Sequence, residues 1–246
     1  QDDQLQKKIR YNQDDAQEQE PSDYTSNKVE SLNLSCVGFF RKTLNKKSET
    51  AKYNYDARFL KENTIKNYEA IILLAANSND PLRNFPQDSF YKISYKFTIR
   101  IAKICKKYGK KFIFPSSCSV YGFGKKIFNE KSKTYPITGY SKNKLKIEKR
   151  LIKLANKNFS PIALRFSTVF GFSERMRFDI VINMLSALAV VKKKIILNSD
   201  GQAWRPHINI KNVCESFELI LNYKFNNGKL NVFNVGFNNN NLKIID

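Results

Sequence analysis

The sequence predicts an α/β protein built on a doubly wound parallel sheet, with a small mixed lobe at its C-terminal end. Short apolar runs of strand length alternate with amphipathic stretches of helix length from residue 34 to residue 166. This alternation is typical of a parallel sheet whose strands are joined by helical crossovers. Beyond residue 171 the apolar runs lose this regular spacing, which indicates a separate lobe. Of the 246 residues 41% are hydrophobic, which is enough for a buried core in a chain of this length.

Each expected element follows from its own pattern of apolar residues. Continuous short apolar runs indicate buried strands, whereas apolar residues three or four positions apart indicate helices. Gly109 marks the end of one helix, because glycine is common directly after helix ends. The expected strands are 34–40, 70–76, 111–115, 161–166, 194–197 and 231–235, and the expected helices are 58–66, 88–108, 140–158, 178–190 and 212–223.

The composition divides the chain into three expected parts. Residues 1–33 are rich in Gln, Asp, Glu and Ser and contain no glycine and no apolar periodicity, so we expect a disordered or degenerate N-terminal arm. Residues 34–170 form the expected sheet domain. Residues 171–246 form the expected lobe, which returns one strand to the sheet.

The net charge is strongly positive, at 43 basic against 22 acidic residues, or +21. Residues 1–24 are acidic instead, with seven acids and three bases. A basic body attracts polyanions. The bases are mostly lysines spread along helices, however, and no nucleic-acid-binding motif is present, so nucleic acid is not the expected partner.

Hydropathy and cysteine spacing bear on the compartment and on metal binding. The longest apolar run, residues 70–76, is far shorter than the ~20 residues of a membrane span. The first residues contain no apolar stretch typical of a signal peptide. The cysteines lie too far apart for a metal motif, so we expect reduced thiols, no metal and a cytoplasmic protein. They are Cys36, Cys105, Cys118 and Cys214.

Tyr140 and Lys144 form a Tyr-x-x-x-Lys pair at the start of an expected helix. Their spacing places both side chains on one helix face. An ammonium near a phenol favours the phenolate, which makes tyrosine a usable base near neutral pH. Ser117 lies just beyond the strand 111–115, and ligands of this architecture bind at the carboxyl ends of strands. In a lysine-rich chain the Tyr–Lys spacing alone is weak evidence, and a solvated helix face is the alternative. His207 is the only histidine, which leaves little room for a Ser-His-Asp site.

Seven segments of the chain, in register with one another, carry a resemblance to a family. They are LLAANSNDP (73–81), FPSSCSVYG (114–122), PITGYSKNK (136–144), ALRFSTVFG (163–171), RMRFDIVIN (175–183), SDGQAWRP (199–206) and FNVG (233–236). Over residues 69–236 the chain resembles the extended short-chain dehydrogenase/reductases of the NAD-dependent epimerase/dehydratase family, and among them the nucleotide-sugar 4-epimerase-like members. The resemblance implies a Rossmann-like fold.

The resemblance implies a role for each matching residue. The catalytic residues implied are Ser117, Tyr140 and Lys144. NAD is the implied cofactor, held in the domain 34–170, and a nucleotide-diphosphate sugar is the implied partner, held partly by the lobe. A homodimer through a four-helix bundle of the helices 88–108 and 140–158 is also implied. The implied cofactor-binding residues are Asp56, Leu74, Ala75, Ala76, Tyr140 and Lys144, and the implied substrate-binding residues are Ser117, Thr168, Asn183 and Arg205.

One part of the family pattern has no counterpart. The family opens with a strand, a Gly-x-x-Gly-x-x-Gly turn and a helix whose backbone amides hold the pyrophosphate. Here Gly38 is the first glycine and Gly109 the second. We therefore expect weak NAD binding by this chain.

The residues after Ser117 bear on the reaction. Related dehydratases carry an acidic residue one or two positions after this serine, where this chain has Cys118 and Ser119. Elimination is thereby disfavoured, and a C4 epimerase is the preferred reading. A keto-sugar reductase is one alternative, and a catalytically dead or fragmentary paralogue acting as a binding protein is the other.

Overall fold

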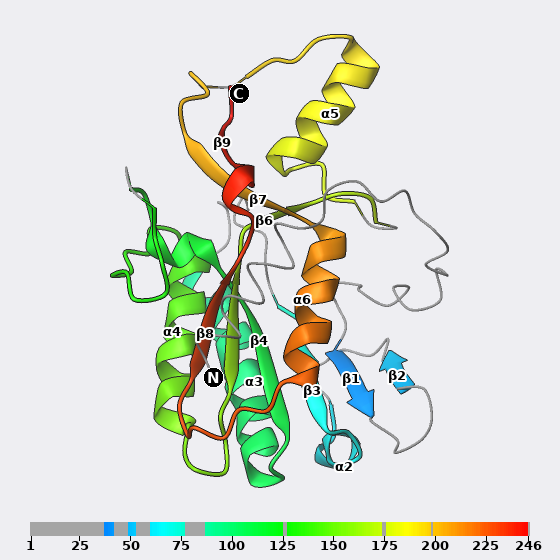
Figure 1. The fold of residues 1–246 in the computed structure, drawn as a ribbon, viewed down its shortest axis with the longest axis vertical. Helices are drawn as coiled ribbons and strands as arrows, with labels where there is room; N and C mark the ends of the chain where they lie inside the picture. Colours follow the sequence, from blue (N-terminus) through cyan, green and yellow to red (C-terminus); the bar gives the residue numbers. More distant parts are fainter. Residues whose placement is uncertain are drawn as a thin grey trace. The chain divides into compact units, whose positions relative to one another are not determined.

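The computed structural model describes residues 37–41, 49–52, 60–76, 87–124, 127–173, 176–197 and 199–245. They divide into two compact units. The sheet unit contains the described residues up to Arg165 together with Lys224–Phe233, and the lobe unit contains Phe166–Tyr223 and the described residues from Asn234 onward. Figure 1 shows the elements of both.

The main sheet has six strands in the order β2-β1-β3-β4-β5-β8. β3 and β4 are parallel, with Ile71 opposite Phe112. The expected α/β class with a Rossmann-like sheet is confirmed, but β1 runs antiparallel to both of its neighbours. An antiparallel pair can be joined by a short connection, and only residues 42–48 separate β1 from β2. The strands are β1 (Val37–Arg41), β2 (Glu49–Lys52), β3 (Ala70–Leu73), β4 (Lys111–Ser117), β5 (Ile162–Phe166) and β8 (Asn231–Val235).

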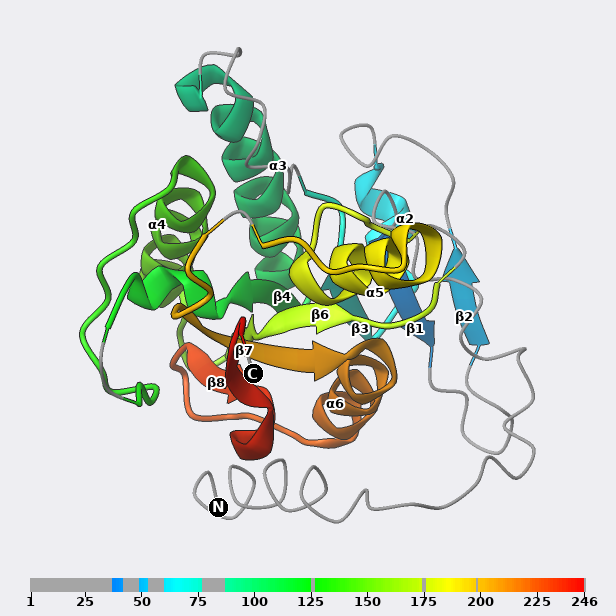
Figure 2. The ribbon, with the colours of Figure 1, turned by 90° about the horizontal axis from the view of Figure 1, so that it is seen from above.

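Two helices lie side by side on one face of this sheet, α3 (Gln87–Lys107) and α4 (Gly139–Leu154) (Figures 1 and 2). The ammonium of Lys146 on α4 lies 4.9 Å from the ring centroid of Tyr95 on α3. The short α2 (Glu62–Lys66) precedes β3. Helices α3 and α4 bury the apolar faces from which they were predicted. An amphipathic helix gains most of its stability by packing its apolar face against a core.

The core lies between these helices and the sheet. Strand β3 is buried along its whole length, as its unbroken apolar run predicted. Burying such side chains stabilises the fold by about 1.5–3 kcal/mol each. The fully buried large side chains of this core include Ile65, Ile71, Ile101, Phe112, Phe114, Ile147 and Leu151.

The lobe unit contains a three-stranded sheet in the order β6-β7-β9. Its strands are β6 (Thr168–Phe170), β7 (Trp204–Asn209) and β9 (Asn241–Lys243), and its helices are α5 (Val181–Lys192) and α6 (Ile210–Asn222). β7 is parallel to β6 and antiparallel to β9. Phe217 of α6 packs edge-on against Phe166, with ring centroids 5.4 Å apart.

The helices and strands predicted from the sequence differ from the observed ones mainly in this lobe. The expected strand 194–197 is wrong, because these residues are in neither helix nor strand and Ile195 and Ile196 are more than half exposed. The helix expected over 140–158 ends at Leu154, since Ala155 leaves the helical conformation with ψ 141°. Strands β6, β7 and β9 were not expected: two have three residues each, and β7 contains Pro206.

No helix among the described residues is long and apolar enough to cross a membrane. In the same part of the chain no group of His, Cys, Asp and Glu could hold a metal ion.

His207 on β7 predicts a pH dependence of stability. Its side chain is 4% exposed and packs against the ring of Phe170, and burial lowers its pKa from 6.5 although backbone groups of Arg205 and Asn240 oppose the shift. The unfolded chain therefore binds a proton as the pH falls through about 6.5 while the folded chain does not. We expect the free energy of unfolding to fall below that pH by at most about 1.4 kcal/mol per pH unit from this group.

Urea denaturation of the wild type and of His207→Leu between pH 8 and pH 5 measures this effect. Carboxylates titrate in both proteins, so the difference between the two curves isolates the histidine. Parallel curves would contradict the prediction.

Candidate active site

Ser117 ends β4 and caps the short 3₁₀ helix η3 (Cys118–Tyr121). Its Oγ accepts hydrogen bonds from the backbone N–H of Ser119 at 3.2 Å and from the hydroxyl of Ser119 at 2.9 Å. With these two bonds the oxygen lone pairs are engaged, and the hydroxyl hydrogen of Ser117 is left to be donated. The carboxyl end of β4 thus presents a hydroxyl donor.

Gly122 makes this turn possible. It ends η3 with φ at +74°, a conformation that costs other residues free energy. A Cβ on Gly122 would lie 2.2 Å from the carbonyl oxygen of Tyr135, so the approach of these two backbone segments also requires glycine.

The start of α4 is fixed by a capping box. Thr138 Oγ1 accepts from the N–H of Ser141 at 3.2 Å, and Ser141 Oγ accepts from the N–H of Thr138 at 3.1 Å. These bonds satisfy backbone donors that the first helical turn leaves open. Tyr140 therefore lies in the first turn and Lys144 one turn later.

Lys144 is bound to the end of β4. Its side chain is 7% exposed, and its Nζ donates to the carbonyl oxygen of Pro115 at 2.5 Å. The same Nζ lies 4.7 Å from the ring centroid of Phe114 and 5.5 Å from that of Tyr140. The structure therefore joins the Tyr–Lys pair to the strand that carries Ser117. The convergence of the Ser117 and Tyr140 oxygens stays a prediction.

Burial sets the charge state of this lysine. Desolvation lowers the pKa of Lys144 to about 8, and the charge of Glu148, one turn further along α4, opposes the shift. At neutral pH the ammonium is still the main form, so it can favour the phenolate of Tyr140.

The expected cofactor residues follow β3. Leu74, Ala75 and Ala76 are partly buried, and Ala75 packs against the core cluster. Small side chains at the carboxyl end of a strand leave room for a ligand to approach. Asp56 lies outside the described residues.

The expected substrate residues Thr168, Asn183 and Arg205 belong to the lobe unit. Asn183 is 7% exposed, and its amide accepts from the N–H of Gly171 at 3.3 Å and donates to the carbonyl of Arg177 at 3.1 Å. The amide thus connects Gly171 and Arg177 to the start of α5. Arg205 donates to the carbonyl of Trp204 at 3.1 Å.

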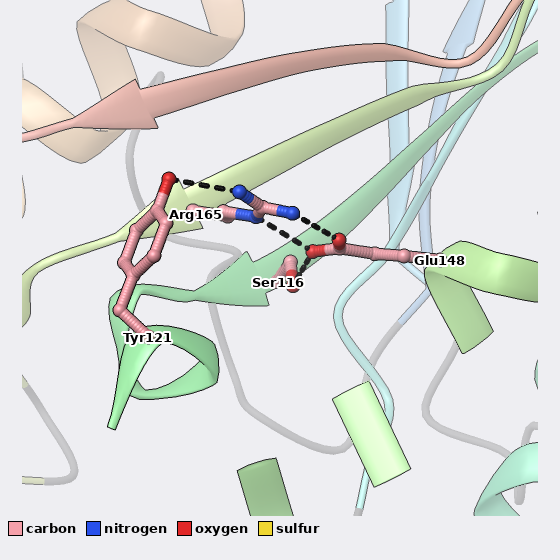
Figure 3. A network of polar contacts seen from close by, with 4 residues as sticks. All are labelled: Ser116, Tyr121, Glu148 and Arg165. Carbon is pink, nitrogen blue, oxygen red and sulfur yellow. Dashed lines mark hydrogen bonds and ion pairs between the residues drawn. The ribbon is translucent and has the colours of Figure 1, made fainter. Parts of the chain in front are cut away.

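Four buried polar residues beside the site were not expected from the sequence (Figure 3). Glu148 Oε1 accepts from Ser116 Oγ at 2.5 Å and from Arg165 Nε at 3.1 Å, and its Oε2 accepts from Arg165 Nη2 at 2.6 Å. Arg165 Nη1 donates to the hydroxyl of Tyr121 at 2.8 Å. The available signal was that Glu148 continues the Tyr140–Lys144 face by one more turn.

The described residues fit the nicotinamide end of NAD better than its pyrophosphate. An ammonium has three donors, and one of those of Lys144 is bound to Pro115. The pyrophosphate calls for a glycine turn at a helix start. Gly38 instead lies within β1, paired with Lys52 and Ile72.

Fold and site together define a class. A Rossmann-like sheet with a serine after one strand and a Tyr-x-x-x-Lys pair on the next helix is the arrangement of short-chain dehydrogenase/reductases. The chain belongs to the NAD dependent epimerase/dehydratase family, whose model matches residues 25–236.

Individual relatives are distant. The chain is 27% identical to the ADP-L-glycero-D-manno-heptose-6-epimerase of Brachyspira hyodysenteriae over an alignment of 156 residues that covers 60% of this chain and 48% of that protein. It therefore spans about half the length of this curated relative.

Solved structures share the fold. The NDP-hexosamine 5,6-dehydratase TunA superposes with a TM-score of 0.67 at 21% identity, covering 77% of this chain and 61% of that one. The UDP-glucuronic acid 4-epimerase of Bacillus cereus superposes with a TM-score of 0.67 at 23% identity, covering 78% and 60%.

Proposed function

We propose that this chain is an NAD-dependent nucleotide-sugar epimerase that removes a hydride from the sugar C4 and returns it to the opposite face. One observation carries the proposal: the buried ammonium of Lys144 lies 5.5 Å from the ring centroid of Tyr140 and is bonded to the strand that ends in Ser117. NAD, when bound, accepts and returns the hydride.

Each residue then has a distinct task. Lys144 stabilises the phenolate of Tyr140, which removes the proton from the sugar hydroxyl as the hydride leaves. Ser117 donates its hydrogen bond to the same sugar oxygen, because its own oxygen already accepts two bonds from Ser119. In the return step Tyr140 gives the proton back. No further acid or base is needed.

The names of relatives support the substrate class. The Bacillus cereus 4-epimerase was solved with UDP-glucuronic acid and NAD, and the Brachyspira relative is named for a 6-epimerase of an ADP-linked heptose. A nucleoside diphosphate sugar is common to both, so we propose this class as the substrate.

The test incubates the chain with NAD at millimolar concentration and a set of UDP-, ADP- and GDP-linked hexoses and hexuronic acids in D₂O. We expect the C4 epimer to form without deuterium at that carbon, because the hydride is returned rather than exchanged with solvent. One-way conversion of a 4-keto sugar with consumption of NADH would instead indicate the reductase, and sugar-nucleotide binding without conversion would indicate a binding protein. Either result would contradict the proposal.

Ser117→Ala is expected to lower kcat about 10²-fold, since it removes one preorganised donor to the reacting oxygen. Ser132→Ala is the matched control, because the Ser132 hydroxyl bonds only within the turn at Asn129 in the contacts described. Epimer formation followed by anion-exchange chromatography measures both. Equal rates for the two variants would remove Ser117 from the mechanism.

A further inference from the structure

The four residues of Figure 3 connect the elements that carry the proposed site. Ser116 lies at the end of β4, Tyr121 on η3, Glu148 on α4 and Arg165 on β5. We call these four residues the buried quartet. Ser116 stands between Pro115, which accepts the bond from Lys144, and Ser117. The buried quartet therefore has members on both β4 and α4, the two elements that carry the proposed catalytic residues. It contains none of those residues itself.

The charges at its centre are almost fully removed from water. The side chains of Glu148 and Arg165 are 2% and 6% exposed. Each oxygen of Glu148 accepts at least one hydrogen bond, and Arg165 donates from three nitrogens. Two parallel N–H···O bonds fix the relative orientation of the guanidinium and carboxylate planes as well as the distance between the two groups.

Stability alone does not call for such a pair. Replacing a buried ion pair by apolar residues of similar volume is often neutral or stabilising, whereas removing one partner is strongly destabilising. A polar quartet at this place thus gives directional bonds where an apolar cluster would give only packing.

We propose that the Glu148–Arg165 pair is a positioning element of the active site, which holds β4 and η3 so that Ser117 and the Pro115 carbonyl keep their places beside Lys144. The inference rests on the proposed function for its catalytic readout. Through Ser116 the pair fixes the residue between Pro115 and Ser117, and through Tyr121 it fixes the far end of the turn that Ser117 begins. Tyr121 is itself held from outside, because its ring stacks on Phe128 at a centroid distance of 5.2 Å.

Glu148 has a second effect, on charge. It follows Lys144 by one turn of α4, and its carboxylate raises the pKa of that lysine against the effect of burial. Among the titratable groups on neighbouring elements, Arg165 and Tyr121 are bonded into the quartet, and Tyr95 of α3 faces Lys146. Loss of the Glu148 charge therefore lowers the pH at which Lys144 gives up its proton.

Two variants separate positioning from stability. Arg165→Met leaves a buried carboxylate without its partner, and we expect a large fall in the melting temperature. The double variant E148L/R165M removes both charges and recovers most of that loss. If the pair serves stability only, the double variant also recovers kcat. We expect instead that its kcat stays at least 10-fold below wild type with KM changed less than 3-fold, and that the alkaline limb of its pH–rate profile moves to lower pH.

A measurement that requires no conversion of a sugar substrate tests this inference independently of the proposed function. Heteronuclear NMR of the Lys144 side chain, recorded at a series of pH values, gives the titration midpoint of this lysine without requiring that a reagent reach its buried amine. We expect the midpoint to fall in the double variant, because the charge of Glu148 that raises the pKa of Lys144 is lost. If the wild type converts no sugar, the proposed function fails while this midpoint still decides the inference.

The matched control is the exposed ion pair of the same unit, Lys107–Glu62, with its atoms 2.7 Å apart. The double variant E62Q/K107M is expected to leave kcat and the Lys144 midpoint unchanged. An unchanged midpoint in E148L/R165M, or full recovery of kcat together with the melting temperature, would overturn the proposal.

Discussion

Replacing Tyr140 by phenylalanine is expected to lower kcat about 10²- to 10⁴-fold, the range of a lost general acid–base group. The ring and its contact with the Lys144 ammonium, 5.5 Å from the centroid, remain in the variant. Only the hydroxyl that exchanges a proton with the sugar is removed. We therefore expect KM to change little while kcat collapses, because the lost interaction acts in the transition state.

The matched control is Tyr135→Phe. Tyr135 also has a lysine over its ring, with Lys133 Nζ 5.2 Å from the centroid, but it is 56% exposed. Conversion of the nucleotide sugar at saturating NAD measures both variants. A Tyr140→Phe protein within threefold of the wild type would end the assignment of Tyr140 as the acid–base residue.

NAD binding by this 246-residue chain is expected to be weaker than micromolar by orders of magnitude. The pyrophosphate carries two charges, which the family meets with backbone amides at a glycine turn where no Cβ blocks approach. Residues 1–37 contain no glycine, and residues 1–24 carry seven acids against three bases. Each hydrogen bond to a charged group is worth about 1.5–3 kcal/mol, so the loss of two weakens binding by roughly 10²- to 10⁴-fold.

Calorimetric titration with NAD and, separately, with nicotinamide mononucleotide tests this expectation. Both ligands carry the nicotinamide ribose that we propose Lys144 holds, and only NAD carries the full pyrophosphate. We expect similar, about millimolar affinities for the two, since the second half of the dinucleotide adds little without the turn. Micromolar binding of NAD would contradict the prediction and would show that other residues of this chain hold the phosphates.

The local sequence pattern was sufficient to predict a helix or strand where one face of that element is buried along its length. The unbroken apolar run of β3 and the three-and-four spacing of α3 and α4 report burial directly, and these elements formed, although β3 ends at Leu73 and α4 at Leu154, earlier than expected. The Tyr140–Lys144 spacing is likewise a local property, because a helix places residues four apart on one face whatever surrounds it. The family could likewise be identified from short segments in register, because each segment is read from residues that are neighbours in the sequence.

Tertiary structure alone decided what depends on residues far apart in the chain. The antiparallel direction of β1 is set by its partners β2 and β3, and the three-residue strands of the lobe exist only through pairing. Lys144 meets Pro115 across 29 positions, and Arg165 meets Tyr121 across 44. Neither contact leaves a trace in periodicity, since a hydrogen bond between distant residues depends on how the elements pack and not on which residues neighbour each other in sequence. The sequence by itself therefore determined the candidate residues, and packing of the sheet unit determined which buried charges hold them.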